Sequence, residues 1–512
     1  MEHQKNIYKC FHEILEEQAK RFGSKNFIEN VDPVCRISFE EMNRRCNKVA
    51  NFLRANGVGS RDAVTVIGNN SIETLIVFFG VLKYGAIINP LNCEESSHNI
   101  SQLIKRIAPK MVVAEATISF DSDIENVPLF SFSTTAQDNP KPNDFFVQLE
   151  KISDEFEGPV GDRSDTGEIL FTSGTTEIPK GILWTREKMF FMVEELVERM
   201  ETSPEDKLLE YRAYSWASAQ LLSVLSSMFI GCTLVLAKRF SRSHFVSWLK
   251  DYSVTKSAGV PAVLNILVSD PVNLHQNDVP HLQFITSSSA PLSSETFDKF
   301  ESMYGIPINQ MAGMSEAGWI MVNPPEKRKK GSVGLPLKYK RVSIFRADGE
   351  RCATGEEGEI VISGTTLGEG YLTDKGFQPF PEQGIQTGDI GYVDEDGYVF
   401  ITGRIKDLII RGGVNISPLE IDNRLLQHPV VVESATVGMP DPKYGETVVS
   451  FVVLSPSQHV TENELQDFCR ETLPEFKIPK KILFVSEMPR TATGKIVKRV
   501  LAEKLRQIDP VV

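Results

Sequence analysis

A loop dense in hydroxyls and glycine follows an apolar strand pattern in the segment ILFTSGTTEIPKG, residues 169–181. Anionic phosphates need hydrogen-bond donors and a backbone that they can approach closely. Ser173, Thr175 and Thr176 offer hydroxyls, Gly174 leaves the backbone open, and Lys180 supplies a positive charge. The segment therefore predicts a site for a nucleotide polyphosphate, with a polar turn that binds nothing as the alternative.

The segment is not a Walker loop, because no Gly-Lys-Ser or Gly-Lys-Thr follows Gly174 at the required spacing, and the chain has no GxGxxG fingerprint. The pattern TSGTT…PKG instead resembles the signature of the AMP-forming adenylating superfamily, which includes acyl-CoA synthetases, peptide-synthetase adenylation domains and beetle luciferases. Six further motifs stand in the order of that family and, with the loop, cover about residues 165 to 500. They are SSSAPL at 287–292, GMSE at 313–316, GSVGLP at 331–336, TGD at 387–389, GRIKD at 403–407 and PRTATGK at 489–495.

The resemblance implies four catalytic residues. Lys495 would reach the α-phosphate and the substrate carboxylate as pyrophosphate leaves, where it would stabilise charge that peaks in the transition state. Glu316 and Thr175 would hold Mg²⁺ beside the phosphates, because a hard cation prefers oxygen ligands. Lys406 would lie at a hinge about which a small C-terminal domain rotates between two reaction steps.

The motifs also imply the ATP-binding residues. Asp389 would accept hydrogen bonds from both ribose hydroxyls, and Arg404 would contact the ribose or a phosphate with a group that stays charged. The implied set comprises Thr172, Ser173, Gly174, Thr175, Thr176, Lys180, Ser289, Ala290, Pro291, Met311, Ala312, Gly313, Met314, Ser315, Asp389, Arg404 and Lys495.

The implied substrate pocket comprises Trp216, Val260, Ser288 and Gly313. Trp216 aligns with an aromatic or histidine gate beside the carboxylate, with a simple core position as the alternative. We expect further apolar lining from Phe190, Phe191, Met311 and Met314. An amino-acid pocket usually offers an acid near the phosphate loop for the α-amine, and we identify none, so we predict an apolar or aromatic carboxylate as substrate.

Gly412 and Gly413, in RGGVN at 411–415, are predicted to border a tunnel for the thin pantetheine arm of coenzyme A, with a plain turn as the alternative. The basic run at 327–330, with Lys338, Lys340 and Arg341, is a candidate for the 3′-phosphate of coenzyme A. A solvated loop face is the favoured alternative for these cations.

Two positions depart from the family pattern. Glu177 stands where glycine is usual and puts an acid near an anionic ligand. Ala312 stands where an aromatic residue commonly stacks on adenine. We therefore expect weaker ATP binding than in a typical member.

The resemblance implies an ATP-dependent acid–thiol ligase that uses ATP, Mg²⁺ and coenzyme A and proceeds through an acyl-adenylate and pyrophosphate. One alternative is a freestanding adenylation enzyme that loads a carrier-protein pantetheine. Another is a noncatalytic nucleotide-binding relative, prompted by Glu177 and Ala312. The expected partners are a small carboxylic acid and the thiol acceptor, and a homodimer is compatible with the sequence.

The elements that position these residues alternate between helix and strand signals over most of residues 1–400. Ser38 and Glu41 form a capping-box pattern before a helix, 63–67 and 86–89 read as strands, and 72–83 reads as a helix between them. The last hundred residues read as a small α+β unit. We predict a multi-lobed α/β domain with parallel sheets at 1–403, a hinge at 404–408 and a mobile α+β domain at 409–512.

The composition fits this assignment. The 512 residues include 41% hydrophobic and 24% charged residues, typical of a globular enzyme, and the net charge of −13 argues against nonspecific binding to nucleic acid or anionic lipid. Seven scattered cysteines and no visible secretory signal predict a cytoplasmic protein. The uncharged stretch 219–237 is long enough for a membrane span, but Gly231 divides it, so we expect a core helix followed by a buried strand.

Overall fold

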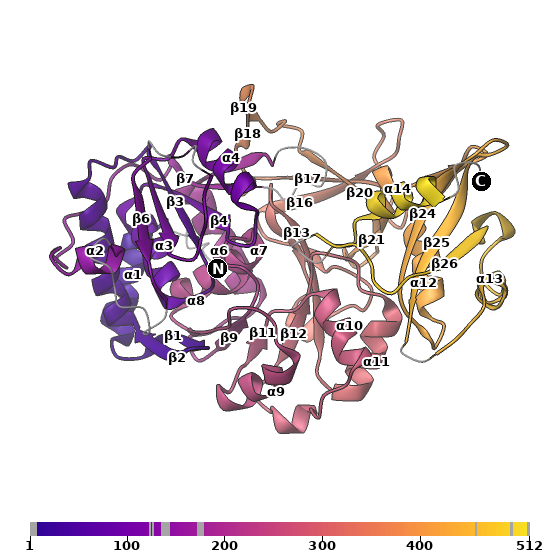
Figure 1. The fold of residues 1–512 in the computed structure, drawn as a ribbon, viewed down its shortest axis with the longest axis horizontal. Helices are drawn as coiled ribbons and strands as arrows, with labels where there is room; N and C mark the ends of the chain where they lie inside the picture. The colour runs from indigo at the N-terminus through magenta and orange to yellow at the C-terminus, as the bar shows by residue number, and fades with distance from the viewer. Residues whose placement is uncertain are drawn as a thin grey trace.

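The computed structural model describes residues 8–121, 124, 127–134, 144–171, 179–455, 458–491 and 495–508. The larger part of the chain contains two large sheets surrounded by helices and a smaller four-stranded sheet, and the C-terminal α+β domain lies at one end of the molecule (Figure 1). The predicted α/β body with a small C-terminal domain is thereby confirmed.

One large sheet has eight strands and contains the strands on both sides of the predicted phosphate loop. Strands β3, β4, β5, β6 and β7 run parallel, as the alternating sequence pattern predicts, whereas β8, β18 and β19 continue the sheet with antiparallel pairs. In spatial order the strands are β19 (Gly376–Pro379), β18 (Gly370–Thr373), β8 (Gly181–Thr185), β7 (Thr166–Phe171), β4 (Ile87–Asn92), β3 (Ala63–Gly68), β5 (Met111–Glu115) and β6 (Leu129–Phe132).

The other large sheet has nine strands, of which the six from β13 to β1 in spatial order run parallel. Their carboxyl ends therefore meet at one edge, where α/β sheets usually bind ligands. In spatial order the strands are β15 (Leu335–Pro336), β14 (Gly318–Val322), β13 (Ile308–Met314), β12 (Phe284–Ser287), β11 (Lys256–Ser257), β9 (Lys207–Glu210), β10 (Thr233–Leu236), β1 (Asn26–Val31) and β2 (Val34–Ser38).

Helices cover these sheets with their apolar sides. They are α1 (Phe11–Phe22), α2 (Phe39–Ala55), α3 (Ile72–Tyr84), α4 (Ser97–Ile107), α5 (Phe145–Leu149), α6 (Arg186–Arg199), α7 (Ala217–Ala219), α8 (Leu225–Ile230), α9 (Arg242–Asp251), α10 (Pro261–Ser269) and α11 (Ser294–Tyr304). One of the two hydrogen bonds of the predicted capping box at the start of α2 is present. The Ser38 side chain accepts a hydrogen bond of 3.2 Å from the Glu41 N–H. The Glu41 carboxylate binds Arg44 and Arg45 instead of the Ser38 N–H.

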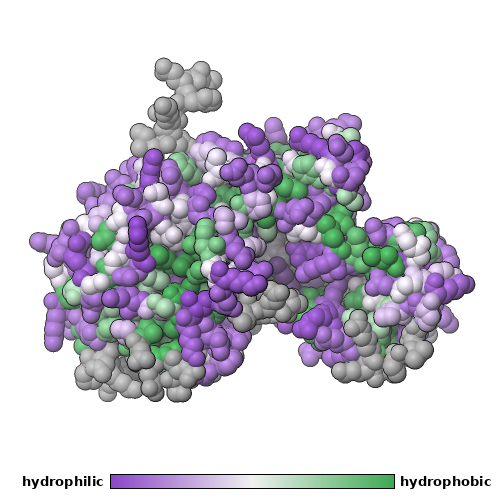
Figure 2. Space-filling model, turned by 90° about the horizontal axis from the view of Figure 1, so that it is seen from above, coloured by the Kyte–Doolittle hydropathy of each residue, from purple (hydrophilic) through white to green (hydrophobic). Residues whose placement is uncertain are grey.

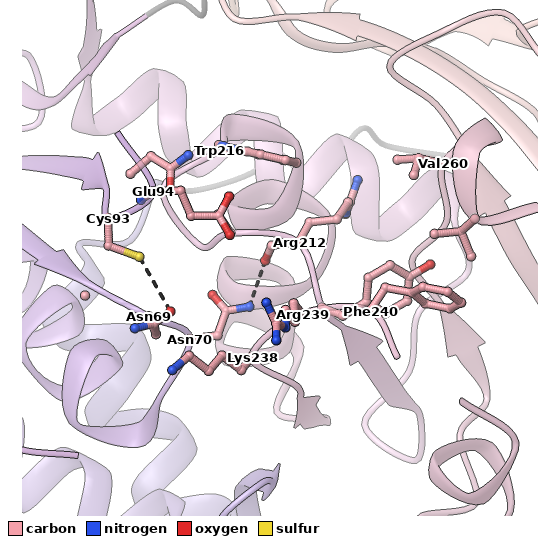
Figure 3. A pocket seen from close by; sticks show the side chains of 15 residues that line it. Asn69, Asn70, Cys93, Glu94, Arg212, Trp216, Lys238, Arg239, Phe240 and Val260 are labelled. Carbon is pink, nitrogen blue, oxygen red and sulfur yellow. Dashed lines mark hydrogen bonds between the residues drawn. The ribbon is translucent and has the colours of Figure 1, made fainter. Parts of the chain in front are cut away.

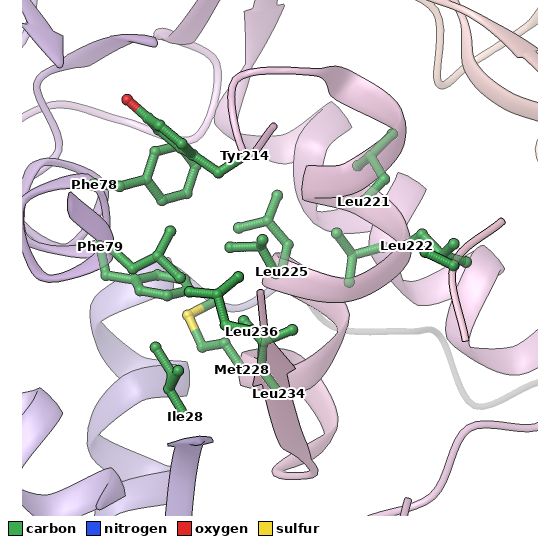
Figure 4. Packing of buried hydrophobic residues seen from close by; sticks show 14 of the residues in the cluster. Ile28, Phe78, Phe79, Tyr214, Leu221, Leu222, Leu225, Met228, Leu234 and Leu236 are labelled. Atoms are coloured by element: carbon green, nitrogen blue, oxygen red, sulfur yellow. The ribbon is translucent and has the colours of Figure 1, made fainter. Parts of the chain in front are cut away.

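The uncharged stretch 219–237 forms part of the core, as expected. Its chain runs through α7, the π-helical turn Gln220–Val224 and α8, ends at the left-handed Gly231, and then forms the fully buried strand β10. Leu225 and Met228 pack with Phe78 and Phe79 of α3 in the main hydrophobic cluster (Figure 4). Among the residues that the structure describes, no helix combines the length and apolar character that a bilayer crossing requires.

The remaining body strands form a four-stranded antiparallel sheet of β16 (Lys340–Phe345), β17 (Gly358–Gly364), β20 (Ile385–Val393) and β21 (Val399–Arg404). The C-terminal domain contains β22 (Ile409–Arg411), β23 (Val414–Ile416), α12 (Pro418–Leu426), β24 (Val431–Asp441), β25 (Gly445–Leu454), α13 (Glu462–Arg470), β26 (Lys481–Phe484) and α14 (Lys498–Ile508). Figure 2 shows a hollow with hydrophilic side chains between this domain and the larger part of the chain.

Candidate active site

The predicted phosphate loop is entered from β7 and left through β8, whose Phe171 and Gly181 are paired. Thr172, Ser173, Gly174, Thr175 and Thr176 lie outside the described residues, and so does Glu177. Lys180 is described and half-buried, and its Nζ lies 5.3 Å from the centre of the Tyr371 ring. The antiparallel pair β7–β8 therefore fixes both ends of the predicted loop.

Glu316 lies in the turn between β13 and β14. The turn is tight, since Gly318 has a φ of +61° and a Cβ there would lie 2.4 Å from the sulfur of Met192. Glu316 Oε1 accepts a hydrogen bond of 2.7 Å from the Tyr371 hydroxyl. Burial of the Tyr371 hydroxyl and, to a lesser degree, the negative charge of Glu316 raise the pKa of Tyr371. The hydroxyl therefore stays protonated and donates the hydrogen bond.

Tyr371 was missed by the sequence reasoning, although it contacts two of the predicted ligand-binding side chains. It lies on β18, a strand far along the chain from both the phosphate loop and the GMSE motif. The antiparallel pairing of β18 with β8 brings it to the site, with Tyr371 opposite Ile182. Tyr371 could be identified only from the pairing of β18 with β8, and no local pattern in the sequence indicates that pairing.

Asp389 and Arg404 face each other across strands β20 and β21. Arg404 Nε lies 2.5 Å from Asp389 Oδ1, and the Asp389 N–H donates to Thr387 Oγ1 at 3.0 Å. Burial alone would lower the pKa of Arg404, but the hydrogen bond and charge of Asp389 raise it. The antiparallel register therefore unites two predicted nucleotide contacts from separate motifs.

Lys495 comes from the C-terminal domain and lies near four charged groups of the other motifs. Burial of the ammonium group and, to a lesser degree, repulsion from Arg404 lower the pKa of Lys495. The negative charge of Asp389 raises this pKa but does not outweigh them. Lys406 and Glu316 are also close enough to affect the pKa of Lys495. The backbone N–H and C=O of Lys495 both bond to Thr491, at 3.1 and 2.9 Å, which fixes the turn that carries it.

The structure thus brings together Lys495, Arg404, Asp389, Lys406 and Glu316, which the sequence places in four motifs. Lys406 is exposed in the short helical turn Ile405–Asp407 between β21 and β22. A cluster of three cations and two anions in a cleft between domains can bind a phosphate and stabilise added negative charge.

The predicted adenine contacts lie at the carboxyl ends of β12 and β13. Ser289, Ala290 and Pro291 are exposed beyond β12, and Ser289 has a left-handed φ of 73°. On β13, Met311 is buried in the main core, whereas Gly313 is exposed. The remaining predicted contacts, Ala312, Met314 and Ser315, are half-buried, and the first two pack against the cluster around Ile320.

Two of the four predicted substrate-pocket residues, Trp216 and Val260, line a cavity of about 220 Å³ (Figure 3). Ser288 and Gly313 do not line it, although Ser288 lies on the neighbouring strand end with a buried hydroxyl that has no partner among the described residues. Phe190 and Phe191, expected in the pocket, pack elsewhere. Phe190 contacts Phe229, and Phe191 contacts Tyr339, because α6 turns both rings away from this cavity.

The loop that carries Trp216 is fixed from both sheets. Asn70, beyond β3, donates to the carbonyls of Arg212 and Ala237 at 2.8 and 2.9 Å, and its side-chain oxygen accepts the Tyr214 N–H at 2.9 Å. Arg212 also forms a buried ion pair with Glu210, with Nη2 to Oε2 at 2.6 Å. A gate residue on this loop is therefore held at a defined position.

Gly412 and Gly413 form the exposed turn of the β22–β23 hairpin, with φ angles of 58° and 83°. A Cβ at Gly413 would meet no atom within 4 Å, so its backbone is open to an approaching ligand. Exposed apolar side chains lie nearby in the same domain, namely Ile410, Val414, Tyr444 and Phe476.

The basic run at 327–330 does not form a free cationic patch. Arg328 pairs with Glu301 at 2.7 Å, Lys329 with Asp394 and Asp396, and Lys330 with Asp298. Lys338 pairs with Glu198, and Lys340 is buried against Glu195. These contacts favour a structural role over coenzyme A binding for these cations.

Comparison with known proteins identifies the family. The family model described as AMP-binding enzyme matches residues 15–372, and the model of its C-terminal domain matches residues 420–495. A probable CoA ligase, CCL9, of Humulus lupulus is 30% identical over 508 residues, covering 96% of this chain and 95% of its own length. The oxalate–CoA ligase of Arabidopsis thaliana is 30% identical over 502 residues, with 96% and 97% covered.

A solved structure gives the same result. The ATP-bound crystal structure of MatB from Rhodopseudomonas palustris superposes with a TM-score of 0.87 at 26% identity, covering 97% of this chain and 99% of MatB. The predicted membership in the adenylate-forming superfamily is confirmed. The chain belongs to the AMP-binding enzyme family.

Proposed function

We propose that this enzyme is an ATP-dependent carboxylic acid–CoA ligase. It activates a carboxylate as an acyl-adenylate with release of pyrophosphate, and then transfers the acyl group to the thiol of coenzyme A. The observation that carries the proposal is the cluster in which Lys495 of the C-terminal domain lies near Arg404, Asp389 and Glu316. The names of the relatives, which include CoA ligases of hop and Arabidopsis, support the same reaction.

In the first step the acid's carboxylate attacks the α-phosphorus of ATP, and the bond to pyrophosphate breaks. Asp389 binds the ribose hydroxyls, and Arg404 contributes a fixed positive charge beside them. Lys495 neutralises the negative charge that grows on the α-phosphate. Loss of such a donor typically costs about 2.7 to 4 kcal/mol of barrier, or a factor of about a hundred to a thousand in rate.

The donor set fits Mg²⁺ bound together with the nucleotide. In the part of the chain that the structure describes, no group of three or more His, Cys, Asp or Glu side chains could hold a metal alone. Glu316 can offer its second oxygen, because the hydrogen bond from Tyr371 goes to Oε1. Mg²⁺ usually takes one or two carboxylates plus nucleotide phosphates, so Glu316 with Thr175 would suffice, and the ion would neutralise phosphate charge.

In the second step a thiolate attacks the acyl carbon and AMP leaves. We propose that residues 404–408 form the hinge between a large domain, 1–403, and a small domain, 409–512. Rotation about Lys406 would remove Lys495 from the cleft and bring Gly412 and Gly413 to the thiol's path. The open backbone at Gly413 supports this role.

For the acid we propose an apolar or aromatic body. The cavity beside Trp216 has an apolar side formed by Tyr211, Trp216, Phe240, Val260 and Val263. Such surface favours an apolar group by about 25 cal/mol per Å² of area that it removes from water.

A carrier-protein pantetheine is the second candidate acceptor. The exposed apolar side chains Ile410, Val414, Tyr444 and Phe476 near the glycine turn offer a surface for a protein partner. A fatty acid–acyl-carrier-protein ligase of Streptomyces coeruleorubidus, 27% identical over 501 residues, is among the relatives.

The test is a screen of aliphatic and aryl acids with ATP and hydroxylamine, which traps acyl-adenylates whatever the acceptor. We expect acid-dependent hydroxamate and pyrophosphate with apolar acids and none with amino acids alone. Free coenzyme A and a holo carrier protein, supplied separately with the best acid, then identify the acceptor by thioester formation. Absence of acid-dependent pyrophosphate across the panel would refute the ligase and support a noncatalytic relative.

A further inference from the structure

The turn that carries Lys495 has its two ends joined by backbone contacts. Arg490 and Ile496 form an antiparallel bridge, and the Val497 N–H donates to the Pro489 carbonyl at 2.8 Å. Helix α14 begins directly after Val497. The groups that bind Arg490 and the first residue of α14 therefore determine where the Lys495 ammonium lies.

Asp422 of α12 binds the first residue of α14. This carboxylate is only 5% exposed, and its two oxygens contact two different elements. Oδ2 accepts a hydrogen bond from Lys498 Nζ at 3.1 Å, and Oδ1 accepts one from the Ser434 hydroxyl of β24 at 3.0 Å. Loss of hydration offsets the attraction within a buried ion pair, so net stability is a weak reason for such a pair. The contacts of Asp422 do fix the start of α14 against both α12 and β24.

This ion pair reaches across the edge of the sheet in the C-terminal domain. β24 ends the strand order of that sheet, and both helices pack against it (Figure 1). Ile421 and Leu425 of α12 belong to one hydrophobic cluster, Leu501 and Leu505 of α14 belong to another, and alternate residues of β25 contribute to each. The helices therefore cover opposite faces of the sheet. Because apolar packing is non-directional, the ion pair supplies the directional contact that sets the position of α14 along β24.

A second ion pair binds the other end of the turn. Arg490 Nη2 lies 2.7 Å from Glu433 Oε1, and Glu433 directly precedes Ser434 on β24. Successive strand residues point to opposite faces of a sheet, so Glu433 lies on the side of α14 and Ser434 on the side of α12. Adjacent residues of one strand thus anchor both ends of the turn, Glu433 directly and Ser434 through Asp422.

α12 also contacts the strand that ends at Arg404. Ser417, the residue before α12, donates to the Thr402 carbonyl of β21 at 2.7 Å. A continuous series of contacts therefore runs from β21 through α12 to Lys498. This series fixes the turn of Lys495 relative to Arg404, the cation with which Lys495 shares the cleft.

We propose that Asp422 and Glu433 are positioning residues for Lys495, and that their ion pairs direct its ammonium to the nucleotide in the adenylation step. Neither acid touches the substrate, because each acts through the cation at one end of the turn. A displacement of about 1 Å in a reacting group can cost about a hundredfold in rate, so small movements of this turn matter. The role in adenylation rests on the proposed function, whereas the fixing of the turn does not.

The experiment compares Asp422→Asn with the wild type in the full chain. Asparagine keeps the size of the side chain and can still accept from Ser434, but it removes the charge that binds Lys498. The matched control is Glu420→Gln. Glu420 lies on the same helix and pairs with Lys477 at 2.6 Å, and neither residue belongs to the turn or binds its ends.

Two assays measure the effect, namely pyrophosphate release from ATP and acid, and thioester formation from a synthetic acyl-adenylate and coenzyme A. We expect Asp422→Asn to lower kcat for pyrophosphate release about tenfold to a hundredfold and to change KM for ATP less than about threefold. Thioester formation should change less than about threefold, and Glu420→Gln should match the wild type in both assays. Glu433→Gln breaks the second ion pair at a half-buried position and should give the same pattern, so it keeps the test decisive if Asp422→Asn does not fold.

A double-mutant cycle with Lys495→Met separates positioning from a general loss of structure. Without the ammonium there is nothing to position, so Asp422→Asn should lower pyrophosphate release no further in that background. The same factor in both backgrounds, equal loss of both reaction steps, or wild-type kinetics for Asp422→Asn and Glu433→Gln would each overturn the proposal.

Amide hydrogen exchange tests the turn without any activity. The peptide that contains Thr491 and Val497 should exchange about tenfold faster in Asp422→Asn than in the wild type or Glu420→Gln, the usual size of a hydrogen bond to a charged group. If no acid supports pyrophosphate release, the proposed ligase function fails, and the exchange rates still decide whether Asp422 fixes the turn. Equal exchange in all three proteins would show that it does not.

Discussion

Tyr371 connects Glu316 with Lys180, through a hydrogen bond of 2.7 Å and a ring lying 5.3 Å from Nζ. Both partners are predicted to bind the nucleotide's phosphates or its metal ion. We predict that Tyr371→Phe, which keeps the ring and removes the hydroxyl, lowers kcat/KM for ATP about threefold to tenfold, the range of one hydrogen bond. The apparent Mg²⁺ requirement should rise as well. Tyr398→Phe, which removes another hydroxyl away from the site, is the control, and equal kinetics for both variants would contradict this role.

Ala312 is a second residue with a defined prediction. Its methyl group packs at the edge of the cluster around Ile320 and offers no ring to adenine. Ala312→Tyr should improve the apparent ATP affinity about twofold to tenfold, because aromatic stacking contributes about 0.5 to 1.5 kcal/mol. Ala312→Leu adds bulk without a ring and should give no such gain. An ATP titration that shows no change for the tyrosine variant would refute the stacking hypothesis.

Lys495 also determines a pH dependence. The proposed adenylation step uses the ammonium group of Lys495. Burial of this group and the nearby charge of Arg404 lower its pKa. The Lys495 ammonium therefore loses its proton at a lower pH than an ordinary lysine, whose pKa is about 10.4. We predict an alkaline fall in adenylation rate with an apparent pKa below that value. In Lys495→Arg any residual activity should not show this fall, since a guanidinium stays charged. An identical alkaline limb in both proteins would show that another group titrates.

At the scale of elements, β7 contains a buried acid just before the phosphate loop. Glu168 is 3% exposed, and burial raises its pKa to about 8. An unfolded Glu titrates near 4.3, so between about pH 4.3 and 8 the folded state binds a proton that the unfolded state has lost. The free energy of unfolding should then fall as pH rises, by at most about 1.4 kcal/mol per pH unit, and level off above pH 8.

We predict that Glu168→Gln removes this slope and is more stable than the wild type at pH 9, with little difference at pH 4. Denaturant unfolding at pH 4, 6.5 and 9 measures it. Glu150→Gln, at an exposed position, should keep the wild-type slope. A Glu168→Gln protein with the same pH dependence as the wild type would show that the carboxyl group is ionised in the folded state.

Elements were easier to predict from sequence than the contacts between them. The helix after Ser71, the stop at Gly85 and the buried strand after Gly231 follow local rules of capping and hydrophobic spacing, and the structure has them as α3, its left-handed cap and β10. Local rules did not predict that Glu41 binds two arginines instead of closing a capping box, or that α6 turns Phe190 and Phe191 into the core. These outcomes depend on neighbours supplied by tertiary packing.

The same distinction applies to the candidate site. The sequence motifs predicted four site residues, Glu316, Asp389, Arg404 and Lys495, and the structure places these four close together. Tyr371, Asn70 and Arg212 could not be found, because their roles come from strand pairing and from the meeting of two sheets. For the basic run at 327–330, the sequence could not show that acids pair with these cations, because the partners, such as Glu301 and Asp394, lie far away in sequence.

At the scale of the whole molecule, the proposed mechanism needs two arrangements of the C-terminal domain. In the structure Lys495 lies in the cleft, which suits adenylation, while the glycine turn of β22 and β23 is exposed. We predict that Lys406→Pro, which restricts the backbone at the proposed hinge, keeps adenylation within about threefold but lowers thioester formation at least about a hundredfold. Lys406→Ala keeps the backbone free and should spare the thioester step. Equal loss of both steps in the proline variant would place the hinge elsewhere.

The proposed mechanism depends above all on Lys495, which the C-terminal domain supplies to the adenylation step. The direct measurement compares Lys495→Met with the wild type in two assays, pyrophosphate release from ATP and acid, and thioester formation from a synthetic acyl-adenylate and coenzyme A. We predict that Lys495→Met lowers the rate about a hundredfold to a thousandfold in the first assay, the usual cost of removing one transition-state donor, and changes the rate less than about threefold in the second. Unchanged pyrophosphate release in the methionine variant would contradict it.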